Sequence, residues 1–159
     1  HSWPDANTFS LAFNDEAYWN KADATISSPL QTQFQQELNL QKSYMEQYGS
    51  FTDMDWTRVV EHLTKDKTDL VSIRCMGVLS MTSYMYTDHF IRNGQLEQAK
   101  KFCQRYLEID PENADAHYFK ALIEMKQGDT QRAKKDFDKA VLLGWHETPD
   151  KKKDAILGF

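Results

Sequence analysis

The chain has no apolar run that approaches the roughly 20 residues a membrane-spanning helix requires. Membrane insertion is therefore not expected. With 159 residues, of which 40% are hydrophobic and 27% charged, the sequence is typical of a soluble globular protein with one core. These features favour no particular compartment, so the cytoplasm and a bacterial cell envelope (periplasm) both remain open.

Cysteine is scarce, and its spacing argues against two common uses. The two cysteines, Cys75 and Cys103, lie 28 residues apart inside helical patterns. This separation matches neither a metal knuckle nor a disulfide scaffold. We interpret both as buried thiols that pack as small apolar residues, and a redox pair is the alternative.

A positive charge excess is also absent. The formal net charge is -5, and residues 1–91 carry 6 Lys or Arg against 12 Asp or Glu, while residues 92–159 carry 13 against 12. Without a basic stripe for phosphate backbones, nucleic-acid binding is not expected. The run Lys151 to Lys153 is interpreted as a solvated segment.

Catalytic and metal-binding motifs are missing from the sequence. There is no hydrolase elbow, phosphate loop or dinucleotide glycine pattern, and the acidic pairs Asp53 with Asp55 and Asp136 with Asp138 lack a partner base. The five histidines show no metal-ligand spacing and stand at His1, His62, His89, His117 and His146. We predict no enzyme, no cofactor and no metal site, with each histidine in a structural or surface role.

What the sequence does contain is an internal repeat. Residues 93–113 resemble residues 126–146, and their matched residues stand 34 positions apart. A fixed offset of this size between helical patterns indicates helical hairpins that stack on one another. The matched pairs are Gly94 with Gly128, Ala99 with Ala133, Lys100 with Lys134 and Lys101 with Lys135.

The pattern in each copy predicts two helices separated by a glycine. The pattern predicts helices over 80–92 and 96–109 in the first copy, and two more either side of Gly128 within 114–143. Gly128 suits the position just past a helix, and Asp129 or Thr130 can cap the next one. Trp145, after Gly144, is expected to fold back onto the last turn.

These two units resemble tetratricopeptide repeats. The resemblance rests on fixed positions of each unit, counted from Ser80 and Ala114. The family's glycine and alanine occur in both units, as Gly94 and Gly128 and as Ala99 and Ala133. At three further positions the second unit has the family's residue type and the first departs from it: Ala121 against Thr87, Phe137 against Cys103, and Ala140 against Tyr106. The resemblance implies an all-α fold, a right-handed superhelical stack of antiparallel helix hairpins. It also implies that the helices of each hairpin pack through Gly94, Ala99, Ala121, Gly128, Ala133, Phe137 and Ala140.

One all-α domain is expected over residues 1–159, with five parts. Residues 1–27 form an irregular lead-in, and 28–79 carry N-terminal helices that could be degenerate repeats. The two repeats cover 80–113 and 114–147, and 148–159 form a capping segment. Within 28–79 the pattern predicts a helix starting at Ser28–Pro29 and ending at Gly49, another over 55–63, and a third from about residue 68 that continues into the first repeat.

The resemblance implies a concave groove that binds a partner peptide or helix, lined by the first helix of each repeat. The expected groove residues are Met81, Tyr84, Asp88, Ile91 and Arg92 in the first repeat, and Asp115, Tyr118, Leu122, Met125 and Lys126 in the second. A carboxylate clamp for chaperone C-termini is not expected, because Tyr84 and Asp88 replace its Lys and Asn.

The predicted function is a non-catalytic protein-interaction or scaffold module. Two alternatives stay open: a homo-oligomerising structural module, with a homodimer as the simplest case, or an accessory subunit of a complex whose active site lies elsewhere. The chain's own N-terminal helix could also fill the groove. If the groove is open, replacing Tyr84 and Tyr118 with alanine should spare folding.

Overall fold

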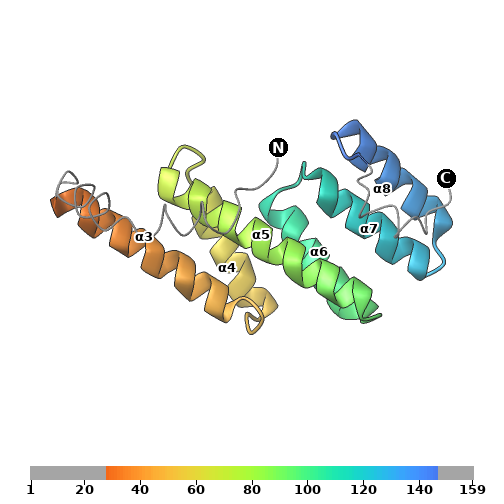
Figure 1. The fold of residues 1–159 in the computed structure, drawn as a ribbon, viewed down its shortest axis with the longest axis horizontal. Coiled ribbons are helices and arrows are strands. Elements are labelled where there is room, and N and C mark those ends of the chain that lie inside the picture. The colour runs from red at the N-terminus through yellow and green to blue at the C-terminus, as the bar shows by residue number, and fades with distance from the viewer. Residues whose placement is uncertain (1–27, 147–159) are drawn as a thin grey trace, which may run out of the picture. The chain divides into compact units, whose positions relative to one another are not determined.

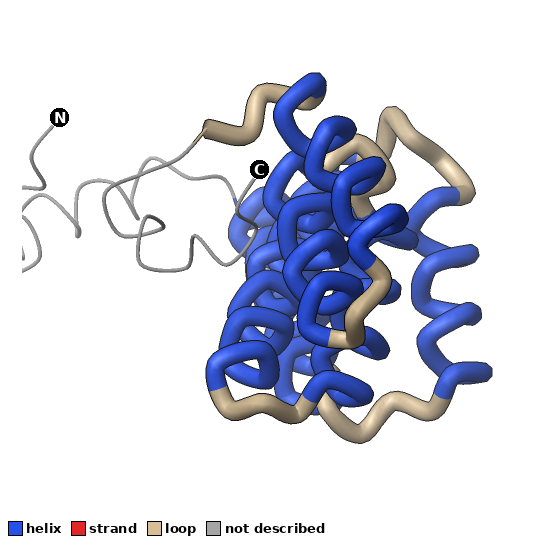
Figure 2. The backbone as a smooth tube through the Cα atoms, turned by 90° about the vertical axis from the view of Figure 1, so that its right-hand side faces the viewer, coloured by secondary structure: helices blue, strands red, loops and turns tan. Residues whose placement is uncertain are grey.

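The computed structural model describes residues 28–146, and over this range the chain is helical without a strand (Figures 1 and 2). Contacts divide the chain into two compact units, residues 1–40 and 41–159. The described helices are α3 (Ser28–Gln47), α4 (Asp53–Thr64), α5 (Leu70–Arg92), α6 (Leu96–Ile109), α7 (Ala114–Lys126) and α8 (Thr130–Leu142). The all-α prediction is confirmed, while the handedness of the stack stays a prediction.

The described part of the first unit is the N-terminal part of α3, up to Leu40. Phe34 and Leu38 are both exposed on this helix. They stand four residues apart, so they share one face. The helix expected from Ser28–Pro29 is present, and its bounds agree with the prediction to within two residues.

In the second unit, α4 and α5 begin at capping side chains. The Thr52 hydroxyl accepts a hydrogen bond from the Asp55 backbone N–H at 3.1 Å, and the Asp69 carboxylate accepts one from Ser72 at 2.9 Å. Such caps satisfy amides that the first turn of a helix leaves without a partner. Helix α5 then runs for 23 residues without interruption, so the prediction that it continues into the first repeat is confirmed.

Glycine turns close both hairpins in the same way. Gly94 and Gly128 have φ of 71° and 86°, values that glycine adopts more easily than other residues. The residue after each glycine donates to the carbonyl five positions back, Gln95 to Phe90 and Asp129 to Glu124, both at 2.9 Å. The repeated hydrogen bond, which ends α5 and α7, is the pattern of a glycine-terminated helix.

The two hairpins pack side by side in the second unit (Figure 1). Helix α5 packs on α6, α7 packs on α8, and α6 joins the hairpins by packing on α7. Small residues lie at the helix contacts: Ala99, Ala121, Ala133 and Ala140 are fully buried. Small side chains allow close approach of helix backbones, which explains alanine at these repeat positions.

A buried arginine ties the non-repeat residues to the first repeat. Arg105 on α6 donates to the backbone carbonyls of Tyr48 at 2.9 Å and Phe51 at 2.6 Å. Its guanidinium also lies over the rings of Trp56 and Phe102, at 5.1 and 5.4 Å from their centroids. The aromatic rings enclose the cation while the carbonyls satisfy its N–H groups.

The domain plan remains a prediction. The lead-in expected over 1–27 and the cap expected over 148–159 lie outside the described residues. Within the described range, α3, α4 and the first part of α5 occupy the segment expected to hold degenerate repeats, and α4 contacts both α5 and α6. This packing joins α4 to the same unit as the repeats.

Candidate interaction surface

The expected groove residues fall into three groups by exposure. Met81, Arg92 and Lys126 are exposed, and Tyr84, Asp88, Asp115 and Met125 are half-buried. Ile91, Tyr118 and Leu122 are buried among core residues. The open part of the surface therefore belongs mainly to α5.

On the first repeat, α5 presents a sulfur-rich apolar surface. Met81 is 53% exposed, and Met85, which the sequence analysis did not include, is 61% exposed. Between them in the sequence, the Tyr84 ring lies 4.9 Å from the Phe119 ring, which holds it from the α7 side. Arg92 Nε donates to both carboxylate oxygens of Asp88, at 2.8 and 3.0 Å, so the C-terminal end of this surface is polar.

The second repeat differs, because its own C-terminal turn covers the equivalent tyrosine. Gly144 has φ of 98°, and Trp145 N–H donates to the Ala140 carbonyl at 2.9 Å. This turn stacks the Trp145 ring on Tyr118, with centroids 4.3 Å apart and planes 16° apart. The expected fold-back of Trp145 is confirmed, and its consequence for Tyr118 was missed.

Three of the expected groove residues are buried, and Trp145 covers one of them, Tyr118. Tyr118 is 3% exposed, and Ile91 and Leu122 are similarly buried, so in this structure they belong to the core and not to an open groove. Because Tyr118 is buried, we now expect the Tyr118→Ala part of the double alanine variant to destabilise the fold. Removal of Tyr118 would leave Trp145 without the ring on which it stacks.

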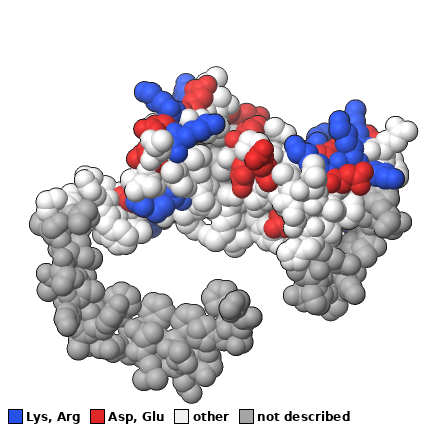
Figure 3. Space-filling model, turned by 90° about the horizontal axis from the view of Figure 1, so that it is seen from above, with Lys and Arg blue, Asp and Glu red and all other residues white. Residues whose placement is uncertain are grey.

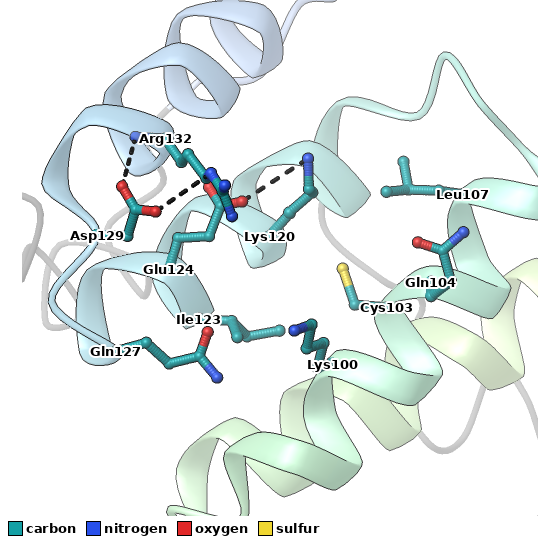
Figure 4. A pocket seen from close by; sticks show the side chains of 10 residues that line it. All are labelled: Lys100, Cys103, Gln104, Leu107, Lys120, Ile123, Glu124, Gln127, Asp129 and Arg132. Atoms are coloured by element: carbon teal, nitrogen blue, oxygen red, sulfur yellow. Dashed lines mark hydrogen bonds and ion pairs between the residues drawn. The ribbon is translucent and has the colours of Figure 1, made fainter.

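A hollow that the sequence did not indicate lies between α6, α7 and α8 (Figure 4). It has a volume of about 330 Å³. Ile123, Cys103 and Leu107 supply apolar lining, while Lys100 and Lys120 supply cationic groups. Burial raises the pKa of the Cys103 thiol to about 12, so this cysteine stays protonated at neutral pH and is no nucleophile.

Behind this hollow, a charged cluster links α7 to α8. Asp136 is 8% exposed and accepts hydrogen bonds from Lys120 Nζ at 2.8 Å and from His117 Nδ1 at 3.2 Å. Desolvation raises the pKa of Asp136, but the Lys120 and His117 hydrogen bonds outweigh it and lower the pKa overall. For Glu124, desolvation and the negative charge of Asp136 raise the pKa.

The histidine of this cluster has a structural role. The second ring nitrogen of His117, Nε2, lies 3.1 Å from the Pro111 carbonyl oxygen. The two ring nitrogens thus face the Asp136 carboxylate and the Pro111 carbonyl. His117 therefore joins the start of α7 to α8 through Asp136.

The described surface carries charges of both signs. On the face in Figure 3, Lys and Arg side chains stand beside Asp and Glu side chains and do not gather into a basic patch. Within residues 28–146, no group of three His, Cys, Asp or Glu side chains could hold a metal ion. No helix in that range is long and apolar enough to cross a membrane.

The fold and its glycine turns define the class of protein as a helical-hairpin repeat. Residues 90–142, in the C-terminal part of the chain, match the family model of the tetratricopeptide repeat. This confirms the resemblance found in the sequence. No curated protein and no solved structure shows a significant match to the chain. Tetratricopeptide repeats generally mediate protein–protein interaction or scaffolding.

Proposed function

We propose that this chain is a non-catalytic interaction module that holds a protein partner along the open face of α5. The observation that carries the proposal is the pair of exposed methionines, Met81 and Met85, on α5, the helix that leads into the matched residues 90–142. A soluble domain usually buries such side chains, and a cluster of them on one helix face is typical of a binding surface.

The chemistry of this face favours an apolar or amphipathic segment as ligand. Methionine side chains are flexible and polarisable, so they adapt to partner side chains of different shapes. Tyr84 adds a ring at the edge of the face, and the Asp88–Arg92 pair supplies a polar rim. An amphipathic helix could place its apolar stripe on the methionines and its polar residues next to the Asp88–Arg92 pair.

The second repeat supports the partner surface from behind. Trp145 and Phe137 pack on Tyr118, which fills the position where the first repeat presents Tyr84. Met125 is half-buried and Lys126 exposed at the end of α7, so they can extend the surface past α5. We therefore expect the strongest contacts at Met81 and Met85 and weaker ones at Met125 and Lys126.

Site-specific photo-crosslinking tests this proposal. A photoreactive residue is placed at position 81 or 85 of the full chain, with Lys134 on the exposed part of α8 as the matched control position. Both α5 positions should give the same protein adduct in an extract of the source organism, and position 134 should not. The Met81→Asp and Met85→Asp double variant should lose the adduct yet keep its helical circular dichroism.

Two results would overturn the proposal. One is the absence of a protein adduct from both α5 positions when the variants are folded. The other is an adduct that forms equally from position 134, since this would show contact without selection for the α5 face. A second copy of the chain as the adduct counts as a protein partner here.

A further inference from the structure

The exposed apolar face of α5 extends well beyond the expected groove. Leu70 is 63% exposed and Ile73 is 42% exposed, and both precede the repeat. With Met81 and Met85 they form a stripe at helical spacing, here named the α5 stripe. Between Asp69 and Asp88, the only exposed charged side chain near it is Arg74.

Gly77 lies at the centre of the α5 stripe, and neither its backbone conformation nor its surroundings within the chain require a glycine there. A Cβ atom built at Gly77 has no neighbour within 4 Å, and the residue lies inside a regular helix without positive φ. Glycine in a helix interior destabilises the helix relative to alanine. The glycine therefore creates a shallow notch in an exposed apolar face.

The stripe is close to symmetric about this notch. Ile73 and Met81 stand four residues before and after Gly77, and Leu70 and Met85 stand seven before and eight after. In an antiparallel pair of identical helices that cross at Gly77, Ile73 of each helix meets Met81 of the other. A contact of this kind is self-complementary, as a twofold symmetric interface requires.

We propose that the α5 stripe binds a second copy of this chain, with the two α5 helices antiparallel and their Gly77 residues at the crossing point. This deepens the proposed function, on which it rests, by naming the partner. Without side chains at the crossing, the helix backbones can approach closely and the flanking apolar side chains can interlock. The stripe is nearly uncharged, so its partner must be apolar along the same length.

The charges at the two ends of the stripe are compatible with this arrangement. Lys67 and Asp69 precede α5, while Asp88 and Arg92 lie near its end. Antiparallel packing about Gly77 places Lys67 of one copy, ten residues before the crossing point, near Asp88 of the other copy, eleven residues after it, so these two opposite charges can face each other. It also opposes the two helix dipoles, whereas parallel packing would align them.

The interface is short, so we expect a weak dimer that forms as concentration rises. Sedimentation velocity of the purified full chain over a concentration series should show a monomer–dimer equilibrium. Gly77→Leu fills the notch, and it should raise the dimer dissociation constant at least about tenfold. Because nothing lies within 4 Å of the new Cβ, the same variant should keep or raise the melting temperature of the dilute monomer.

Disulfide trapping tests the geometry directly. In mild oxidant, Gly77→Cys should form a disulfide-linked dimer, because the twofold axis passes beside this position. Ile73→Cys is the matched control: its twin lies eight residues further along the pair, about 12 Å away, and should not link. The native cysteines, Cys75 and Cys103, are buried, so the wild type should give no linked dimer.

Other occupants of the stripe would give different results. A chain that stays monomeric at all concentrations, with no linked dimer from Gly77→Cys, overturns the proposal. If the photoreactive residue at position 81 then captures a different protein, the proposed function stands and only its partner is wrong. Efficient linking of Ile73→Cys to its own twin overturns the antiparallel arrangement.

Discussion

The first and second repeats share a backbone plan but differ in what they leave open. Both hairpins turn at a glycine with positive φ, and each has a fully buried alanine in its second helix, Ala99 and Ala133. The first repeat leaves Met81 and Met85 exposed. In the second, Trp145 covers the tyrosine that corresponds to Tyr84 of the first repeat.

The two repeats also differ in a helix cap and in one buried hydroxyl. Asp129 caps α8 by accepting from the Arg132 N–H at 3.1 Å, whereas α6 begins without a side-chain cap. Thr87 of the first repeat is fully buried with no hydrogen-bond partner for its hydroxyl, and the second repeat has Ala121 at that position. The two repeats therefore differ in whether a ring covers the shared tyrosine, in the cap of the second helix and in the side chain at the position of Thr87 and Ala121.

The largest expected effect tests whether the backbone plan is truly shared. Ala133→Trp and Ala99→Trp each force a large ring into a fully buried helix contact, and each should destabilise the protein by about 3 kcal/mol. Urea unfolding followed by circular dichroism measures the change. Lys134→Trp, on the exposed face of α8, is the control and should change stability little. Similar wild-type and Ala133→Trp midpoints would contradict the repeat packing.

A smaller loss of stability should follow from removing the Trp145 ring, which covers Tyr118 in the second repeat. Trp145 is only half-buried, so Trp145→Ala should cost about 2 kcal/mol rather than the larger loss of a full core truncation. The change should also expose Tyr118, measured as increased hydrogen exchange near the start of α7. Trp145→Phe keeps a ring on Tyr118 and should recover most of the stability. An unchanged melting temperature in Trp145→Ala would show that the stack contributes nothing.

Substitutions at one equivalent position of the two repeats, Thr87 and Ala121, should change the free energy of unfolding in opposite directions. Thr87→Val removes the unsatisfied hydroxyl but keeps the shape of the side chain, and should stabilise the protein by about 1 kcal/mol. Ala121→Thr introduces such a hydroxyl into the second repeat and should destabilise it by at least as much. Thermal unfolding of both variants checks the pair. A loss of stability in Thr87→Val would mean that the hydroxyl has a partner.

The smallest expected effect concerns the charged cluster of the second repeat and depends on pH. The folded-state pKa of Glu124 is raised, so its contribution is present in acid and is lost as pH rises through that pKa. Glu124→Gln stays neutral, and we expect it to be modestly more stable than wild type at neutral pH but equal in acid. Unfolding midpoints across the pH range measure this crossover.

The control for this pH effect is Asp138→Asn, a charge removal on the exposed face of α8. It should shift stability little and without the same crossover. The pKa of Asp136 is lowered, whereas that of Glu124 is raised. Asp136 therefore stabilises the fold at neutral pH, and this stabilisation is lost as pH falls. If Glu124→Gln is less stable than wild type at neutral pH, the charged carboxylate contributes a favourable contact.

Most of the helical plan could be predicted because its signals are local. The glycines at 94, 128 and 144 each mark a helix end, and the Asp129 cap was among the expected ones. The burial of Tyr118 could not be predicted, since it depends on where the expected turn places the Trp145 ring. The exposure of α5 could not be predicted either, since it depends on which elements pack against that helix. The spacing of His117, Lys120 and Glu124 along one face of α7 could have indicated their cluster, but their partner Asp136 lies on another helix.

The contacts of Arg105 have a consequence for how this protein unfolds. Its two carbonyl acceptors belong to residues more than 50 positions earlier, and Trp56 Nε1 crosses the same junction to donate to Glu108 at 2.6 Å. A fragment cut before α5 would strand a buried cation without acceptors, which is costly. The non-repeat residues from Tyr48 and the first hairpin therefore form one cooperative folding unit, and native-state proteolysis should release α4 only together with α6.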